Sequence, residues 1–145
     1  MRRFNLLLAI FLPLLANPAG AADRLAGPVP ATVLRVVDGD TVEVEAHIWL
    51  GQTIRTLVRI KGVDAPELHG RCPRERDLAE QARAYVTAHL GGEVELRDIV
   101  RDKYGGRVVA RIAPSGGGDI SVALIGAGLG RPYGGGHKNP WCGRS

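Results

Sequence analysis

The chain has 145 residues, the length of one domain, with 19 Lys and Arg residues against 15 Asp and Glu residues. Its 45% of hydrophobic and 23% of charged residues are typical of a globular protein and exclude a disordered tail or a coiled coil. The 20 glycines and 9 prolines indicate many turns, and therefore a β-rich protein rather than an all-helical one.

Residues 1–21 have the pattern of a secretory signal peptide. Two arginines begin the segment, a short apolar stretch follows over 6–15, and small residues in an Ala-x-Ala arrangement end it at 19–21. We expect cleavage after Ala21 or Ala22 and a periplasmic or secreted product without stable membrane insertion. The alternative is an uncleaved anchor, for which the stretch is short against the about 20 apolar residues of a membrane span.

The chain has two cysteines, Cys72 and Cys142. An even count in an exported protein favours one disulfide, which would join the C-terminal tail to the middle of the chain. The alternative is two unpaired thiols. Neither a CxxC motif nor a histidine pair at ligand spacing is present, so nothing in the sequence supports a thiolate or histidine metal site.

The first part of the expected fold is a meander of three strands, because β-branched and alternating apolar residues recur there with period two. Asp38 and Gly39 indicate a hairpin turn after the first strand, since both residues tolerate positive φ. The three strands are expected over Ala31–Val37, Thr41–Glu45 and Thr53–Lys61.

A helix is expected over Pro73–Leu90, because proline suits a first helical turn and Gly91 and Gly92 suit a helix end. Its expected buried face consists of Leu78, Ala82, Tyr85, Val86 and Leu90. Two further strands and a short helix are expected over Glu93–Val100, Arg107–Ile112 and Ser121–Ala127.

Five short strands with a helix between the third and the fourth match the plan of an OB-fold. The sequence therefore predicts a β-rich α+β protein, a five-stranded Greek-key barrel with a short C-terminal helix. We expect this domain over 29–133, followed by a Gly-rich tail without pattern over 134–145.

Three polar clusters stand at the turns of this fold, over Val37–Val42, Arg59–Glu67 and Asp102–Arg107. Taken singly, each has an ordinary structural explanation. The first fits a hairpin turn, the second a strand end followed by a capped loop, and the third a turn with solvated charges.

Together, and in this order, the strings DGDTV, VDAPE and DKYGGR resemble the staphylococcal nuclease (thermonuclease) family over about residues 31–133. The resemblance implies an OB-fold enzyme that uses Ca²⁺ to hydrolyse phosphodiester bonds in DNA and RNA. We expect a monomer. The alternatives are an inactive OB-fold that binds nucleic acid or another partner, and an interaction module of the cell envelope.

The resemblance also implies roles for individual residues. The calcium ligands fall on Asp40 and Asp64 and on the backbone carbonyl of Ala65, and the catalytic glutamate falls on Glu67. Ala65 stands where the best-known member has threonine, but only a backbone oxygen is needed there. Three carboxylates brought together would repel one another, and a divalent cation between them would remove that cost.

The two phosphate-binding arginines fall on Arg59 and Arg107, and the nucleotide-holding residues on Lys103, Tyr104 and Tyr133. A planar guanidinium can grip two phosphate oxygens at once, which a lysine cannot do.

The third cluster departs from the family pattern, because Gly105 and Gly106 stand where the family has one glycine. The alternating apolar residues from position 108 onward place Arg107 at the start of the next strand, and an inserted glycine is easily absorbed in a turn. Arg111 shares the parity of Arg107 and is its rival, about 13 Å further along the strand.

Overall fold

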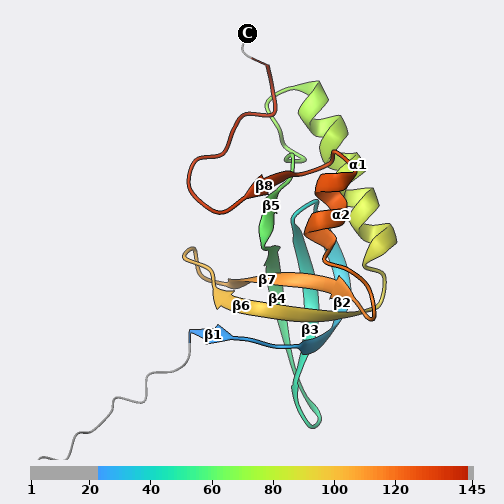
Figure 1. Ribbon diagram of the computed structural model, residues 1–145, viewed down its shortest axis with the longest axis vertical. Helices are drawn as coiled ribbons and strands as arrows, with labels where there is room; N and C mark the ends of the chain where they lie inside the picture. The colour runs from blue at the N-terminus through green and yellow to red at the C-terminus, as the bar shows by residue number, and fades with distance from the viewer. Residues whose placement is uncertain (1–22, 144–145) are drawn as a thin grey trace, which may run out of the picture.

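The computed structural model describes residues 23–143, and the expected signal peptide over 1–21 lies outside this range. Ten elements follow one another along the chain (Figure 1). They are β1 (Arg24–Leu25), β2 (Val29–Asp38), β3 (Thr41–Trp49), β4 (Gln52–Ile60), β5 (Gly62–Asp64), α1 (Pro73–His89), β6 (Glu93–Arg101), β7 (Arg107–Pro114), α2 (Ile120–Gly126) and β8 (Arg131–Tyr133).

Five of the strands close into a barrel, which confirms the predicted OB-fold. The meander β2–β3–β4 is antiparallel, β4 pairs with β7 in parallel, and β6 pairs with both β7 and β2. In the β4–β7 ladder Leu57 lies opposite Arg107 and Arg59 lies opposite Val109. This closing pair of strands therefore brings the second and third polar clusters to the same side of the barrel.

The barrel interior is filled by aliphatic side chains, as alternation in the strands predicts. Val42, Val44 and Val58 of the meander are fully buried, as are Ala110 and Ile112 of β7. Strand β7 begins at Arg107, the position that the sequence analysis gave this residue.

Helix α1 covers one end of the barrel beside α2 (Figure 1). Ala82, Val86 and Leu90 are buried as expected, but Leu78 and Tyr85 are only half-buried. Ala79 and the carboxylate-bearing Glu75 are buried on the inner face instead. The small alanines lie where the helix packs most closely, and the larger side chains lie at the rim of the contact.

The turn between β2 and β3 differs from the prediction, because neither Asp38 nor Gly39 has positive φ. Gly39 is required there for space. A Cβ atom on this residue would lie 2.7 Å from the Cβ of Ala82 and 2.8 Å from that of Ala65. The turn therefore lies directly against α1, and it holds the residue that follows, Asp40, in a buried position.

Strands β5 and β8 form a separate two-stranded antiparallel sheet that the sequence analysis did not predict. Each has only three residues, too few to show a period of two. Their pairing places Gly62 opposite Tyr133 and Asp64 opposite Arg131, so the end of the chain returns to the second polar cluster. Over residues 23–143, the helices include none that is long and apolar enough to cross a membrane.

Candidate active site

Arg59 is the centre of a buried charge cluster between the ends of β4 and β5. Its Nη2 atom lies 3.2 Å from Oδ2 of Asp40 and 3.9 Å from Oδ1 of Asp64. Its Nη1 atom donates hydrogen bonds of 2.9 Å to the backbone carbonyls of Ile60 and Val63. The guanidinium is thus held by two backbone carbonyls and two carboxylates, and its departure would leave the buried Asp40 without its ion-pair partner.

Asp40 is held by the backbone as well as by Arg59. Its Oδ2 accepts a hydrogen bond of 2.9 Å from the N–H of Ala65, and its Oδ1 accepts one of 3.2 Å from the Thr41 hydroxyl. Burial raises the pKa of Asp40 to about 6, although Arg59 opposes this effect, and the nearby charge of Asp38 adds to the rise. The carboxylate pair therefore favours additional positive charge in its neighbourhood.

Asp64 takes its partners from the Gly-rich tail. Nζ of Lys138 lies 2.7 Å from Oδ1 of Asp64, and Nε1 of Trp141 donates a hydrogen bond of 3.3 Å to Oδ2. This Oδ1 oxygen has an ionic partner but no hydrogen bond within residues 23–143. Although burial acts to lower the pKa of Lys138, its contact with Asp64 holds that pKa above the ordinary range.

Sequence reasoning missed Lys138 and Trp141, because the tail has no regular pattern. The signal that could have found them is the cysteine beside them. Cys142 is joined to Cys72 by a disulfide, which confirms that prediction. Trp141 also packs under the guanidinium of Arg131, with Cζ 3.8 Å from a ring centroid, so the tail is fixed against the β5–β8 sheet.

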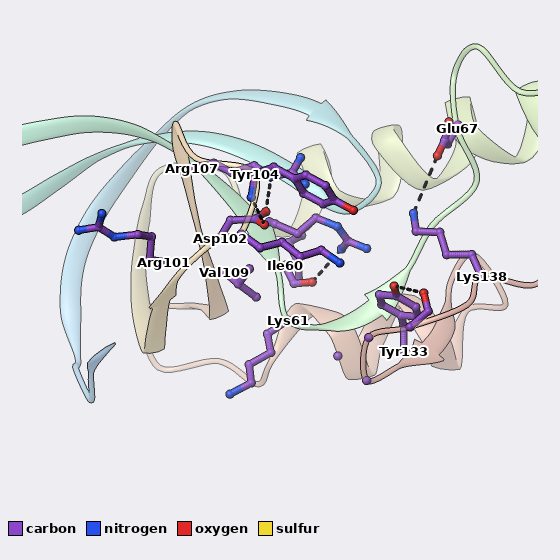
Figure 2. Close-up of a pocket in the computed structure, with 16 residues that line it drawn as sticks. Ile60, Lys61, Glu67, Arg101, Asp102, Tyr104, Arg107, Val109, Tyr133 and Lys138 are labelled. Atoms are coloured by element: carbon purple, nitrogen blue, oxygen red, sulfur yellow. Dashed lines mark hydrogen bonds and ion pairs between the residues drawn. The ribbon is translucent and has the colours of Figure 1, made fainter. Parts of the chain in front are cut away.

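Glu67 lies on the loop between β5 and α1, with Lys138 beside it (Figure 2). Its side chain is 67% exposed, and its nearest charged partner is Lys138, at 3.9 Å. The same ammonium lies 2.7 Å from Oδ1 of Asp64, so Lys138 contacts both of these carboxylates. Asp40 and Asp64 are buried, whereas Glu67 is exposed at the edge of the cleft described below.

The loop that carries Glu67 is held by a buried carboxylate, that of Glu75 on α1. Its Oε1 accepts a hydrogen bond of 3.5 Å from the N–H of Glu67, and its Oε2 accepts one of 3.0 Å from the N–H of Arg71. The buried position of Glu75 at the start of α1 makes it the residue that fixes the backbone of Glu67.

The third cluster forms a turn closed by an ion pair between Asp102 and Arg107. Burial acts to raise the pKa of Asp102, but the hydrogen bonds from Arg107 and from the N–H of Tyr104 outweigh it and hold that pKa below its ordinary value. The Arg107 guanidinium lies 5.7 Å from the Tyr104 ring centroid. Arg111 lies elsewhere and binds Asp119 at 2.8 Å.

These elements enclose an open cleft of about 740 Å³ (Figure 2). Most of the residues that the sequence analysis selected line it, and Lys138 joins them at one side. They are Arg59, Glu67, Lys103, Tyr104, Arg107 and Tyr133. Asp40, Asp64 and Ala65 lie behind Arg59 and do not line the cleft, and Arg111 does not reach it. The cleft thus combines cationic and aromatic side chains, which suits an anionic ligand that carries rings.

The two buried aspartates fit a hard cation with oxygen ligands. Both carboxylates converge on one guanidinium, and Oδ1 of Asp64 lacks a hydrogen bond within the described chain. Ca²⁺ accepts carboxylate and carbonyl oxygens and completes its shell with water. Asp40 and Asp64 could therefore hold it, together with the backbone oxygen of Ala65.

A second cluster of possible ligands does not fit a metal. Within residues 23–143, the one group of three His, Cys, Asp or Glu side chains whose ligand atoms lie within 4.8 Å of one another is Cys72, Glu75 and Cys142. The two sulfur atoms share a disulfide and are not thiolates, so they cannot act as ordinary thiolate ligands.

A closed OB-fold barrel with a basic cleft beside two buried carboxylates defines a class of nuclease-type or nucleic-acid-binding domains. Residues 57–139 match the family model described as staphylococcal nuclease homologue, and the chain belongs to this family. The match runs from within β4 to the tail and includes both the second and the third polar cluster, together with Lys138.

Proposed function

We propose that this protein is a secreted, Ca²⁺-dependent nuclease that hydrolyses phosphodiester bonds in DNA and RNA. The observation that carries the proposal is the arrangement of two arginines, Arg59 and Arg107, in a cleft directly beside the buried pair Asp40 and Asp64. A phosphodiester is anionic and repels a hydroxide, so a hydrolytic site must supply positive charge where negative charge develops.

Substrate binding would use the basic and aromatic lining of the cleft. The guanidinium groups of Arg59 and Arg107 would each grip phosphate oxygens through a planar fork. Tyr104 and Tyr133 offer ring faces to a base or a sugar, and Lys103 adds charge next to Tyr104, with its Nζ 4.9 Å from the ring centroid. Such a lining recognises backbone charge and stacking rather than base sequence, which fits both DNA and RNA.

Hydrolysis would use Glu67 as the group that orients water and accepts its proton. Water attacks phosphorus, the proton passes to the Glu67 carboxylate, and the bond from phosphorus to the leaving oxygen breaks, with that oxygen taking a proton from solvent water. Arg59 and Arg107 stabilise the charge that grows on the phosphate oxygens. Asp40, Asp64 and the Ala65 carbonyl would hold Ca²⁺, which would supply further positive charge beside the phosphate.

The proposal is tested with the purified protein, single-stranded DNA and, separately, RNA, each in millimolar Ca²⁺ or in excess chelator. We expect cleavage with Ca²⁺ and none with chelator, because weak extracellular-type sites need Ca²⁺ in about this range. The variant Asp40→Asn removes one of the proposed Ca²⁺ ligands, and it should lose cleavage at all Ca²⁺ concentrations. Full activity in chelator would overturn the metal dependence, and DNA binding without cleavage would favour the inactive OB-fold.

A further inference from the structure

We propose that Lys138 is a tethered competitor of the divalent cation: its ammonium neutralises Asp64 in the metal-free protein and must leave that carboxylate when the metal binds. The inference rests on the proposed metal site at Asp40 and Asp64. It assigns a role in metal affinity to the Gly-rich tail, which the proposed reaction itself does not use.

The position of the ammonium is the first observation. Nζ of Lys138 lies 2.7 Å from Oδ1 of Asp64 and 3.9 Å from Oε1 of Glu67 (Figure 2 shows the second contact). It also lies 5.8 Å from the ring centroid of Tyr133. The lysine thus stands between a buried carboxylate and the proposed catalytic glutamate, on the oxygen of Asp64 that has no hydrogen bond within residues 23–143.

The second observation is that both ends of the segment around Lys138 are fixed. On one side Tyr133 pairs with Gly62 in the β5–β8 sheet, and on the other Cys142 is bonded to Cys72. A chain segment closed at both ends keeps its side chains near their targets at a high effective concentration. The lysine therefore competes for Asp64 intramolecularly, whatever the concentration of free cations.

The Lys138 ammonium and a divalent cation compete for Asp64 because both are positively charged. One anionic oxygen cannot hold an ammonium at 2.7 Å and a divalent cation at a bonding distance, because the two cations repel strongly at such separations. A ligand that binds only the minor, lysine-free form has an apparent affinity reduced by the population of that form. The tail thus lowers metal affinity while it keeps the metal-free site electrostatically neutralised.

Calorimetric titration of Ca²⁺ into the full protein tests this without any assay of activity. We expect Lys138→Met to bind Ca²⁺ roughly two- to fivefold more tightly than wild type, the range for removal of a partly exposed ion pair. Lys61→Met is the matched control, because Lys61 also lines the cleft but pairs with no carboxylate within residues 23–143. It should change the affinity much less.

Thermal unfolding in chelator gives a second readout. Lys138→Met should unfold at a lower temperature than wild type without metal, and Ca²⁺ should stabilise it more than it stabilises wild type. The double variant Cys72→Ser/Cys142→Ser should also bind Ca²⁺ more tightly than wild type, because it frees one end of the tail. An unchanged affinity in the double variant would overturn the role of the tether.

The outcomes separate this inference from the proposed function. If Lys138→Met binds Ca²⁺ no more tightly than wild type while Asp64→Asn abolishes binding, the metal site stands and the competition is wrong. If Asp64→Asn binds Ca²⁺ as wild type does, the proposed metal site itself is wrong. If Lys138→Met and Lys61→Met both bind Ca²⁺ more tightly, the loss of one positive charge explains the change in affinity. That result would overturn the specific role of Lys138.

Discussion

Asp102 accepts a hydrogen bond from Nε of Arg107 across the turn that carries Lys103 and Tyr104. The same carboxylate accepts the N–H of Tyr104 at 3.2 Å, so one buried side chain holds both the guanidinium and the backbone of the turn. Asp102, which itself lines the cleft, thereby positions Lys103, Tyr104 and Arg107.

We expect Asp102→Asn to lower the free energy of unfolding by about 1–3 kcal/mol at neutral pH, because it weakens the hydrogen bonds of a buried group. The pKa of Asp102 is held below its ordinary value of 3.8 in the folded protein. Its ionised form therefore stabilises the fold above the unfolded-state pKa, and this contribution is lost as the pH falls through the lower folded-state pKa.

Urea unfolding of wild type and Asp102→Asn between about pH 2 and pH 7 measures this effect. The difference between the two proteins should be largest near neutral pH and shrink in acid. The exposed Asp77→Asn controls for the loss of one carboxylate. A difference that is the same at all pH values would mean that the ion pair with Arg107 does not contribute.

Arg107→Ala should lower phosphodiesterase turnover by about 10²–10³-fold, as expected when one charge-stabilising group is removed from a hydrolytic site. Arg111→Ala should change turnover little, because Arg111 is engaged with Asp119 outside the cleft. Both variants are measured on the same DNA, with circular dichroism to check folding. The reverse ranking would assign the second phosphate contact to Arg111.

Glu67→Gln should reduce turnover by roughly 10²–10⁴-fold, the usual range for a positioned general base. The fold should survive, because the Glu67 side chain is 67% exposed and its backbone is held by Glu75. Steady-state kinetics and thermal unfolding of the same sample separate the two effects, and the exposed Glu80→Gln is the control. Kinetics close to those of wild type would show that Glu67 has no catalytic role.

Gly39→Ala should destabilise the protein by about 1–3 kcal/mol, because the new Cβ would lie within 2.8 Å of two alanine Cβ atoms on α1 and after β5. Gly118→Ala is the matched control, since its Cβ would meet nothing within 4 Å. Chemical unfolding of both variants measures the difference. Equal stability would show that the turn at Gly39 moves away from α1 easily.

The strands of the barrel and the position of Arg107 could be predicted because they depend on alternation along the chain, a local property. The conformation of the turn at Asp38 and Gly39 could not, since it is set by the close approach of α1 rather than by the two residues. The burial of Glu75 could not be predicted either, because it depends on the loop that folds over this residue.

The site was only partly predictable for a related reason. The motifs identified Arg59, Asp40 and Asp64, which the structure brings together. They did not show that the Glu67 side chain would be exposed while both aspartates are buried, because its place depends on the path of the loop after β5. Lys138 and Trp141 reach Asp64 through the disulfide and the pairing of β8, both of which are contacts between distant parts of the chain.

The parallel pairing of β4 with β7 makes the turn before β7 an insertion site. In that ladder Arg59 lies opposite Val109, two residues along β7 from Arg107, so hydrogen bonds within the barrel fix the backbone spacing of the two arginines. The length of the connection at Gly105 and Gly106, both with positive φ, does not enter this spacing. Residues could therefore be added between the two glycines to extend the rim of the cleft over a longer substrate, while the two guanidinium-bearing positions keep their separation.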